Sequence, residues 1–192
     1  MPSWIEAQAA ITGLKRLLRF DAGFVNWFDG RPSGARRAFW LMLPMLPMSL
    51  FNLFVPLDAK LDDGWLAVIA HVLVWYVLSW VMFPLILIVI GQAIRRESQT
   101  IGAITPFIWY NFFLGLLSCT LTLLSLVPQI GSLIDDLTWP IIIISLIYEV
   151  FLLQVVIGVG YVGAGLIAIV DFALSRSLLF LLIMPVVVLP TS

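Results

Sequence analysis

Long apolar segments fill most of this chain, and they limit what it can fold into. Of the 192 residues, 62% are hydrophobic and only 11% are charged. Soluble domains have about 45–50% apolar and about 25% charged residues, so one small core could not keep this much apolar surface away from water. We therefore expect lipid to surround much of the chain. The predicted fold class is all-α, a polytopic membrane helical bundle.

Five segments are long and apolar enough to cross a bilayer, whose hydrocarbon core of about 30 Å takes about 20 helical residues. The expected transmembrane helices are residues 38–55, 65–90, 101–126, 139–157 and 161–184. The last two could instead be divided at the polar residues 171–177. That division would leave about 14 residues for the final piece, which is short for a span. We therefore place it at the glycines near residues 158–165.

An N-terminal region, residues 1–36, precedes the transmembrane bundle of residues 37–192. Residues 3–20 are predicted to form an amphipathic helix, since Ile11, Leu14 and Leu18 recur at helical spacing. The basic residues on its other side are Lys15, Arg16 and Arg19. Such a helix suits the anionic surface of a membrane, and the alternative is a solvated cap packed under the bundle. Residues 29–34 are predicted to form a loop from their turn-forming composition.

Charged residues alternate along the chain and predict its orientation. Six of the ten basic residues precede the first span, and Arg95 and Arg96 follow the second. Acidic residues gather in the loops between, at Asp58, Asp62, Asp63, Asp135 and Asp136. Because basic loops stay in the cytoplasm, we expect a bacterial inner-membrane protein with its N-terminus in the cytoplasm and its C-terminus in the periplasm. The net charge of -1 argues against nucleic acid as a partner.

Three polar side chains within the spans form the candidate intramembrane cluster: Asn111, Glu149 and Asp171. If the chain turns near Val159, both carboxyl groups lie about 15–18 Å deep and Asn111 about 15 Å deep from the same side. Charge at this depth is costly, so such groups face a partner or a cavity. They could bind a proton or a cation, or they could join helices by hydrogen bonds. A weak ion pair between Arg176 and Asp171 is also possible.

Four closely spaced glycines lie between the last two spans: Gly158, Gly160, Gly163 and Gly165. Their spacing matches a dinucleotide-binding loop, but that loop needs a preceding strand and a βαβ unit. Here we expect a tight helical hairpin with close backbone approach instead.

No other motif points to an enzyme, a metal or a cofactor. Cys119 is alone in an apolar segment, and His71 has no second ligand at metal-binding spacing. No hydroxyl group has a base placed to activate it. We therefore expect a non-enzymatic protein without a cofactor.

Eight short motifs follow one another along the chain in an order that is also found in a known group of proteins. They are residues 17–21, 27–29, 38–40, 95–96, 107–111, 148–151, 156–159 and 164–174, the last including Asp171. In this order they resemble a group of uncharacterised proteobacterial inner-membrane proteins related to the Yip family, whose members have five membrane helices. The resemblance implies five spans and no established activity. Yip proteins of eukaryotes are named for interaction with Rab-type GTPases, a role that we do not expect in bacteria.

These observations favour a scaffold, assembly factor or accessory subunit of a membrane complex, because aromatic and small residues suit contact between helices. The alternative is a small oligomeric transporter or channel for protons or cations that uses the carboxyl groups. The expected partners are the lipid bilayer and other membrane proteins or further copies of the chain.

Overall fold

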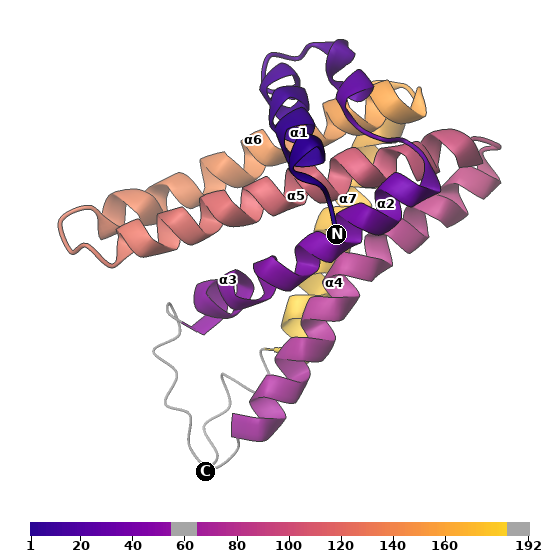
Figure 1. Cartoon of the computed structure of the whole chain (residues 1–192). Helices are drawn as coiled ribbons and strands as arrows, with labels where there is room; N and C mark the ends of the chain where they lie inside the picture. The colour runs from indigo at the N-terminus through magenta and orange to yellow at the C-terminus, as the bar shows by residue number, and fades with distance from the viewer. Residues whose placement is uncertain (55–64, 184–192) are drawn as a thin grey trace.

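The described part of the computed structural model, residues 1–54 and 65–183, contains helices and no strand. Five of the helices are long and apolar enough to cross a membrane. The prediction of an all-helical fold with five candidate spans is therefore confirmed (Figure 1). The acidic loop with Asp58, Asp62 and Asp63 lies outside the described residues.

The first candidate span runs from Pro32 to Phe54 and has three parts. Helix α2 (Pro32–Ala38) continues through the 3₁₀ turn η2 (Phe39–Leu41) into α3 (Met42–Phe54). The prediction of a loop through residue 34 is wrong, because Pro32 occupies the first helical turn. Proline suits this position, since its missing N–H would have no partner there and its backbone angle is already helical.

The other four spans are α4 (Trp65–Ala93), α5 (Glu97–Ser125), α6 (Gly131–Ile157) and α7 (Tyr161–Leu182). Helix α6 begins eight residues before the expected position, so Asp136 lies in the helix rather than in the preceding loop. A helix of 27 residues is about 40 Å long and exceeds the hydrocarbon core, so its first turns can be polar. The break between α6 and α7 falls at the glycines, as predicted.

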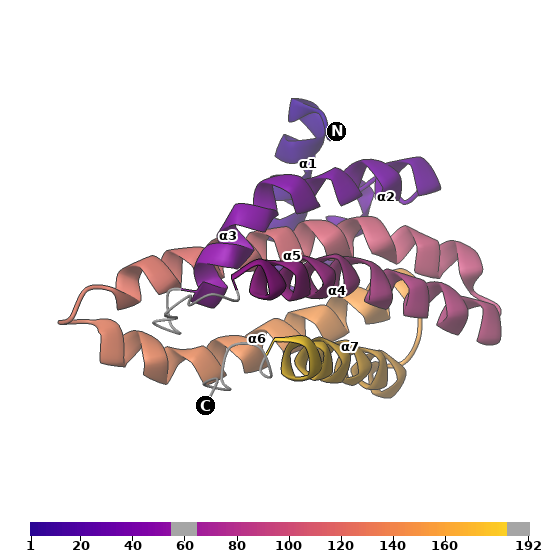
Figure 2. The same cartoon turned by 90° about the horizontal axis from the view of Figure 1, so that it is seen from below.

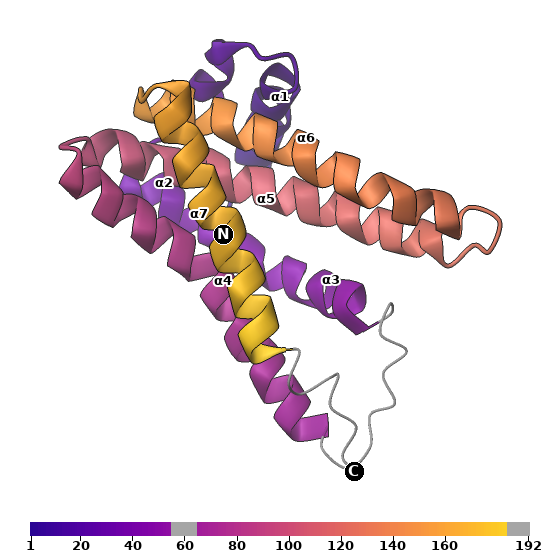
Figure 3. The same cartoon turned by 180° about the vertical axis from the view of Figure 1, so that it is seen from behind.

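Helix α5 lies at the centre of the arrangement and packs against α2, α3, α4 and α6. Helix α7 packs against both α4 and α6. The hairpin of α5 and α6 diverges from the pair α4 and α7, with α3 between them (Figures 1 and 2). The two pairs meet at the end that holds the α4–α5 and α6–α7 turns, as the view from behind also shows (Figure 3).

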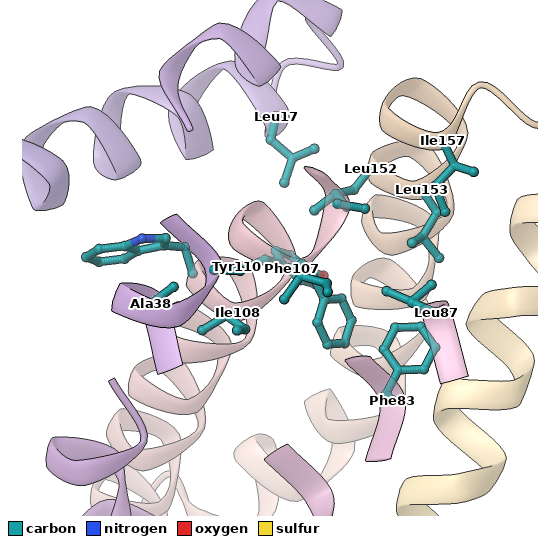
Figure 4. Close-up of a cluster of buried hydrophobic side chains, with 14 of the residues drawn as sticks. Leu17, Ala38, Phe83, Leu87, Phe107, Ile108, Tyr110, Leu152, Leu153 and Ile157 are labelled. Atoms are coloured by element: carbon teal, nitrogen blue, oxygen red, sulfur yellow. The ribbon is translucent and has the colours of Figure 1, made fainter. Parts of the chain in front are cut away.

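A hydrophobic core forms where the pairs meet (Figure 4). Its fully buried side chains include Phe83 and Leu87 of α4 and Leu152 and Leu153 of α6. Other large apolar side chains of the same helices and of α7, such as Val89, Ile143 and Phe180, are exposed. Apolar exposure on this scale is typical of helices surrounded by lipid tails.

The N-terminal segment forms α1 (Trp4–Leu17) and the 3₁₀ helix η1 (Ala22–Trp27). Ser3 and Glu6 form a capping box that starts α1. The inner side of α1 buries Ala10, Leu14 and Leu17, whereas Ile11 and Leu18 are exposed. Of the three residues that predict the apolar face of this helix, only Leu14 packs against the rest of the protein, and Leu18 is the residue that caps the C-terminal end of α1.

Candidate functional site

A cavity of about 250 Å³, with a mostly apolar wall and several polar side chains, lies among the spanning helices α3, α4, α5 and α7. Asn111 of α5 and Asp171 of α7 both line it. Around them are four further polar side chains, Ser49, Tyr76, Ser79 and Ser175. A cavity of this size and polarity has room for several water molecules. The structure thus brings two of the three predicted residues to one cavity.

Glu149 lies on α6, which packs against α7, and is not one of the residues that line this cavity. Its residue is only 6% exposed, and its Oε1 is buried without a hydrogen-bond partner. The carboxyl groups of Glu149 and Asp171 are near enough to repel each other when charged. Asp171 therefore stands between this cavity on one side and a buried second carboxyl group on the other.

The amide of Asn111 donates to the carbonyl of Phe107, one turn earlier on the same helix, at 3.1 Å. Within the described residues, neither Asn111 nor either carboxyl group makes a hydrogen bond to another helix. The hypothesis that these groups join helices by hydrogen bonds therefore has no support in the geometry.

Trp75 and Tyr76 add donors that the sequence did not indicate. The indole Nε1–H of Trp75 is buried without a partner, and Trp75 lines the cavity. The hydroxyl group of Tyr76 donates to the carbonyl of Met42 in α3. An indole N–H can donate a hydrogen bond but cannot accept one. In the sequence, the hint of this donor at the cavity is that Trp75 and Ser79 are one helical turn apart and so lie on the same face of α4. It is a weak signal, because aromatic residues are frequent throughout these spans.

Arg176 does not pair with Asp171, so the ion pair suggested from their spacing is not formed. The Arg176 guanidinium instead lies over the ring of Phe172, 5.3 Å from its centre. The physical reason is the separation of five residues, which places the two side chains on different sides of α7.

The glycines between α6 and α7 have different roles. Gly158 has φ of +71° and ends α6 in the left-handed conformation, while its N–H donates to the carbonyl of Gln154. Arg96 Nη1 donates to the carbonyls of Ile157 at 2.8 Å and of Gly158 at 2.6 Å. These two bonds stabilise the turn between α6 and α7. A Cβ atom at Gly160 or Gly165 would meet nothing within 4 Å, and at Gly163 only an ordinary contact.

The prediction of close backbone approach at Gly160, Gly163 and Gly165 is therefore wrong. The close approach occurs at Gly34, where a Cβ atom would collide with the backbone carbonyl of Asp29. Asp29 is held in place by other bonds, since its carbonyl accepts from the hydroxyl group of Thr105 at 2.8 Å. No spacing pattern in the sequence marks this glycine, because Asp29 lies in the loop before α2.

Three basic residues of the N-terminal segment are exposed, as expected for a surface helix: Lys15, Arg16 and Arg19. Arg16 forms an ion pair of 3.2 Å with Asp21 and lies 5.7 Å from the ring centre of Trp27. In the described part of the chain, no three side chains of His, Cys, Asp or Glu gather as metal ligands would.

Comparison with protein families, with characterised proteins and with solved structures finds no match. The chemistry of the site therefore has to be inferred from its own geometry. Two adjacent carboxyl groups in an apolar interior, one of them lining the cavity, can exchange a proton or hold a small cation.

Proposed function

We propose that this protein takes up and releases a proton or a small cation at Glu149 and Asp171, as a small, non-enzymatic transporter or channel of a membrane. The observation that supports this most directly is the buried Oε1 of Glu149, which has no hydrogen-bond partner in the described part of the chain. Its helix packs against α7, whose Asp171 lines a cavity together with Asn111.

The physical basis is the cost of charge in a low-dielectric interior, which is several kcal/mol for an unpaired carboxylate. Each carboxyl group must therefore carry a proton or balance a cation when the cavity is closed to water. Like charges at one site cannot both persist, so the pair favours binding of at least one positive ion. Asn111 and the serine hydroxyl groups of the cavity supply further oxygen ligands or a path for protons.

Flux measurements in proteoliposomes test this proposal. An imposed pH gradient should dissipate faster in vesicles with the wild-type protein than in empty vesicles. Glu149→Gln together with Asp171→Asn should abolish this difference. Asp136→Asn is the matched control, because Asp136 is an exposed acid near the opposite end of α6 and should leave flux unchanged. Proton and sodium flux that persists in the double variant would refute the proposal.

A second function, as a scaffold, assembly factor or accessory subunit of a membrane complex, is favoured by a different observation. The two helix pairs diverge (Figures 1 and 3), and many of their large apolar side chains, such as Val77, Leu123 and Phe180, are exposed. Exposed side chains of this kind suit contact with another membrane protein or a second copy of the chain. Purification in mild detergent tests it, and a chain that elutes as a bare monomer without any partner would contradict it.

The position in the membrane is a further part of the proposal. The resemblance to Yip-related proteins and the basic residues near the α4–α5 turn favour the bacterial inner membrane with the N-terminus in the cytoplasm. Trp4 and Ile5 are 73% and 76% exposed on α1, which supports a role as an interfacial helix beside anionic lipid. Reporter fusions at both ends test the orientation, and two termini on the same side would contradict it.

A further inference from the structure

A second cavity, distinct from the carboxyl site, lies along the hairpin of α5 and α6 on the side that α7 reaches. Its volume is about 430 Å³. Six aliphatic side chains and five hydroxyl side chains line it, together with Arg176 of α7. The hydroxyl groups belong to Ser118, Thr122, Ser125, Thr138 and Ser145. Such a lining is amphipathic, half hydrocarbon and half polar.

Among the described residues that line this cavity, the Arg176 guanidinium is the one charged group. In the described part of the chain it lies over the ring of Phe172 and forms no ion pair. Arg176 follows the start of α7 by 15 residues, which is about 22 Å along the helix axis. A long basic side chain at this depth can extend towards the nearer headgroup layer, where phosphate groups are the common anions.

Three of the five hydroxyl groups present acceptors rather than donors to the cavity. Those of Ser125, Thr138 and Ser145 donate their hydrogens to carbonyls of their own helices at 2.8, 3.3 and 2.8 Å. Ser118 Oγ accepts from the amide of Asn52 at 3.3 Å, and the Oδ1 of that amide is buried without a partner. A complementary ligand therefore offers a phosphate to Arg176 and hydrogen-bond donors to these oxygen atoms.

We propose that this cavity binds one phospholipid whose headgroup carries both a phosphate and hydrogen-bond donors, as phosphatidylethanolamine does. The phosphate lies at Arg176, the ammonium group bonds to the hydroxyl oxygens, and an acyl chain runs along the leucine and isoleucine side chains. Phosphatidylcholine has the same net charge and the same phosphate but no N–H or O–H donor. Its phosphate can therefore bind Arg176, but its headgroup cannot donate to the hydroxyl oxygens.

Native mass spectrometry of the full chain in detergent tests this site with three probes: phosphatidylethanolamine, phosphatidylcholine with the same acyl chains, and inorganic phosphate. Phosphatidylethanolamine should bind about tenfold more tightly than phosphatidylcholine, since charged donors add about 1.5–3 kcal/mol per hydrogen bond. Arg176→Gln should weaken the binding of both lipids by about tenfold. Thr138→Val together with Ser145→Ala should lower the affinity for phosphatidylethanolamine to that for phosphatidylcholine.

Arg36→Gln is the matched control, because Arg36 is exposed in α2 and far from the cavity in sequence and fold. It should bind both lipids as the wild type does. The variant Thr138→Val with Ser145→Ala loses only hydrogen bonds within α6, so we expect it to fold. It therefore still tests the site if Arg176→Gln does not fold. Equal binding of the two lipids to the wild type, unchanged binding by Arg176→Gln, or displacement of lipid by inorganic phosphate would each overturn the proposal.

Discussion

At the residue scale, Arg37 joins the N-terminal segment to the first span. Its Nε lies 2.6 Å from Glu6 Oε1, and its Nη2 lies 2.8 Å from Asp29 Oδ2. Burial raises the pKa of Glu6, but the Ser3 N–H and the Arg37 guanidinium outweigh it and hold the pKa below 4.5. The Arg31 N–H, followed by Arg37, holds the pKa of Asp29 below 3.8 despite its partial burial.

The first prediction concerns the pH dependence of this contact. A carboxyl group whose pKa is lowered by folding stabilises the folded state above its unfolded pKa, and this contribution is lost as pH falls through the lowered folded value. We therefore expect α1 to stay docked at pH 5–8 and to loosen below about pH 4. Limited proteolysis within residues 1–31 at different pH values measures this.

Glu6→Gln and Asp29→Asn together should remove most of that pH dependence and loosen α1 at neutral pH. Asp136→Asn should leave the profile unchanged, because Asp136 is remote from α1. If the wild-type protein were cleaved within residues 1–31 as fast at pH 6 as below pH 4, the prediction would be wrong.

Gly158 gives the second prediction at this scale. Gly158→Ala places a side chain at φ of +71°, which costs about 1–2 kcal/mol, and its Cβ would lie 2.6 Å from Arg96 Nη1. We expect the thermal midpoint in detergent to fall. Gly160→Ala is the matched control, since Gly160 has φ of −64° and open space around it. Equal midpoints for the two variants would show that the left-handed turn is not required.

At the element scale, a small aromatic group attaches the segment after α1 to helix α6. The ring of Phe20 stacks on Tyr148 at 4.9 Å and meets Phe151 edge-on at 5.2 Å. The hydroxyl group of Tyr148 also donates to the carbonyl of Leu18 at 3.2 Å. These contacts position α1 and η1 beside the end of α6 that precedes the glycine turn.

Phe20→Ala should therefore destabilise the protein more than Tyr148→Phe. Each aromatic pair contributes about 0.5–1.5 kcal/mol beyond area burial, so loss of two pairs costs about 1–3 kcal/mol. Tyr148→Phe keeps the stacking and loses one partly exposed hydrogen bond, which costs about 0.5–1.5 kcal/mol. Chemical unfolding followed by tryptophan fluorescence measures both, and the reverse order would contradict this account.

At the scale of the whole molecule, the two helix pairs meet at one end and diverge at the other (Figures 1 and 2). The closed end contains the buried core and the bonds from Arg96 to the α6–α7 turn. The open end contains the hydroxyl-lined cavity along α5 and α6. Both proposed sites therefore depend on how far the pairs separate within a bilayer.

Spin labels test this separation in lipid nanodiscs after Cys119→Ser. Labels at Val127 and Phe180, near the free ends of the two pairs, should give a long distance. Labels at Ile94 and Val159, in the two turns at the closed end, should give a short one. Similar distances for the two label pairs would show that the helix pairs lie parallel in the membrane.

The helical class, the five candidate spans and the break at Gly158 could all be predicted from the residues alone. The physical reason is that the bilayer sets the length and the apolar character of any spanning segment, and only a left-handed glycine ends α6 here. The sequence also indicated Glu149 and Asp171, because carboxyl groups are conspicuous within apolar segments.

Which helices meet, and what each polar group faces, could be learned only from the folded chain. These spans are apolar on all sides, and lipid tails are as apolar as a neighbouring helix, so no stripe of residues marks the buried face. The sequence therefore could not place Trp75 at the cavity, separate Arg176 from Asp171, or turn Leu14 inwards while Ile11 stays exposed. Those outcomes depend on packing between segments distant in the chain.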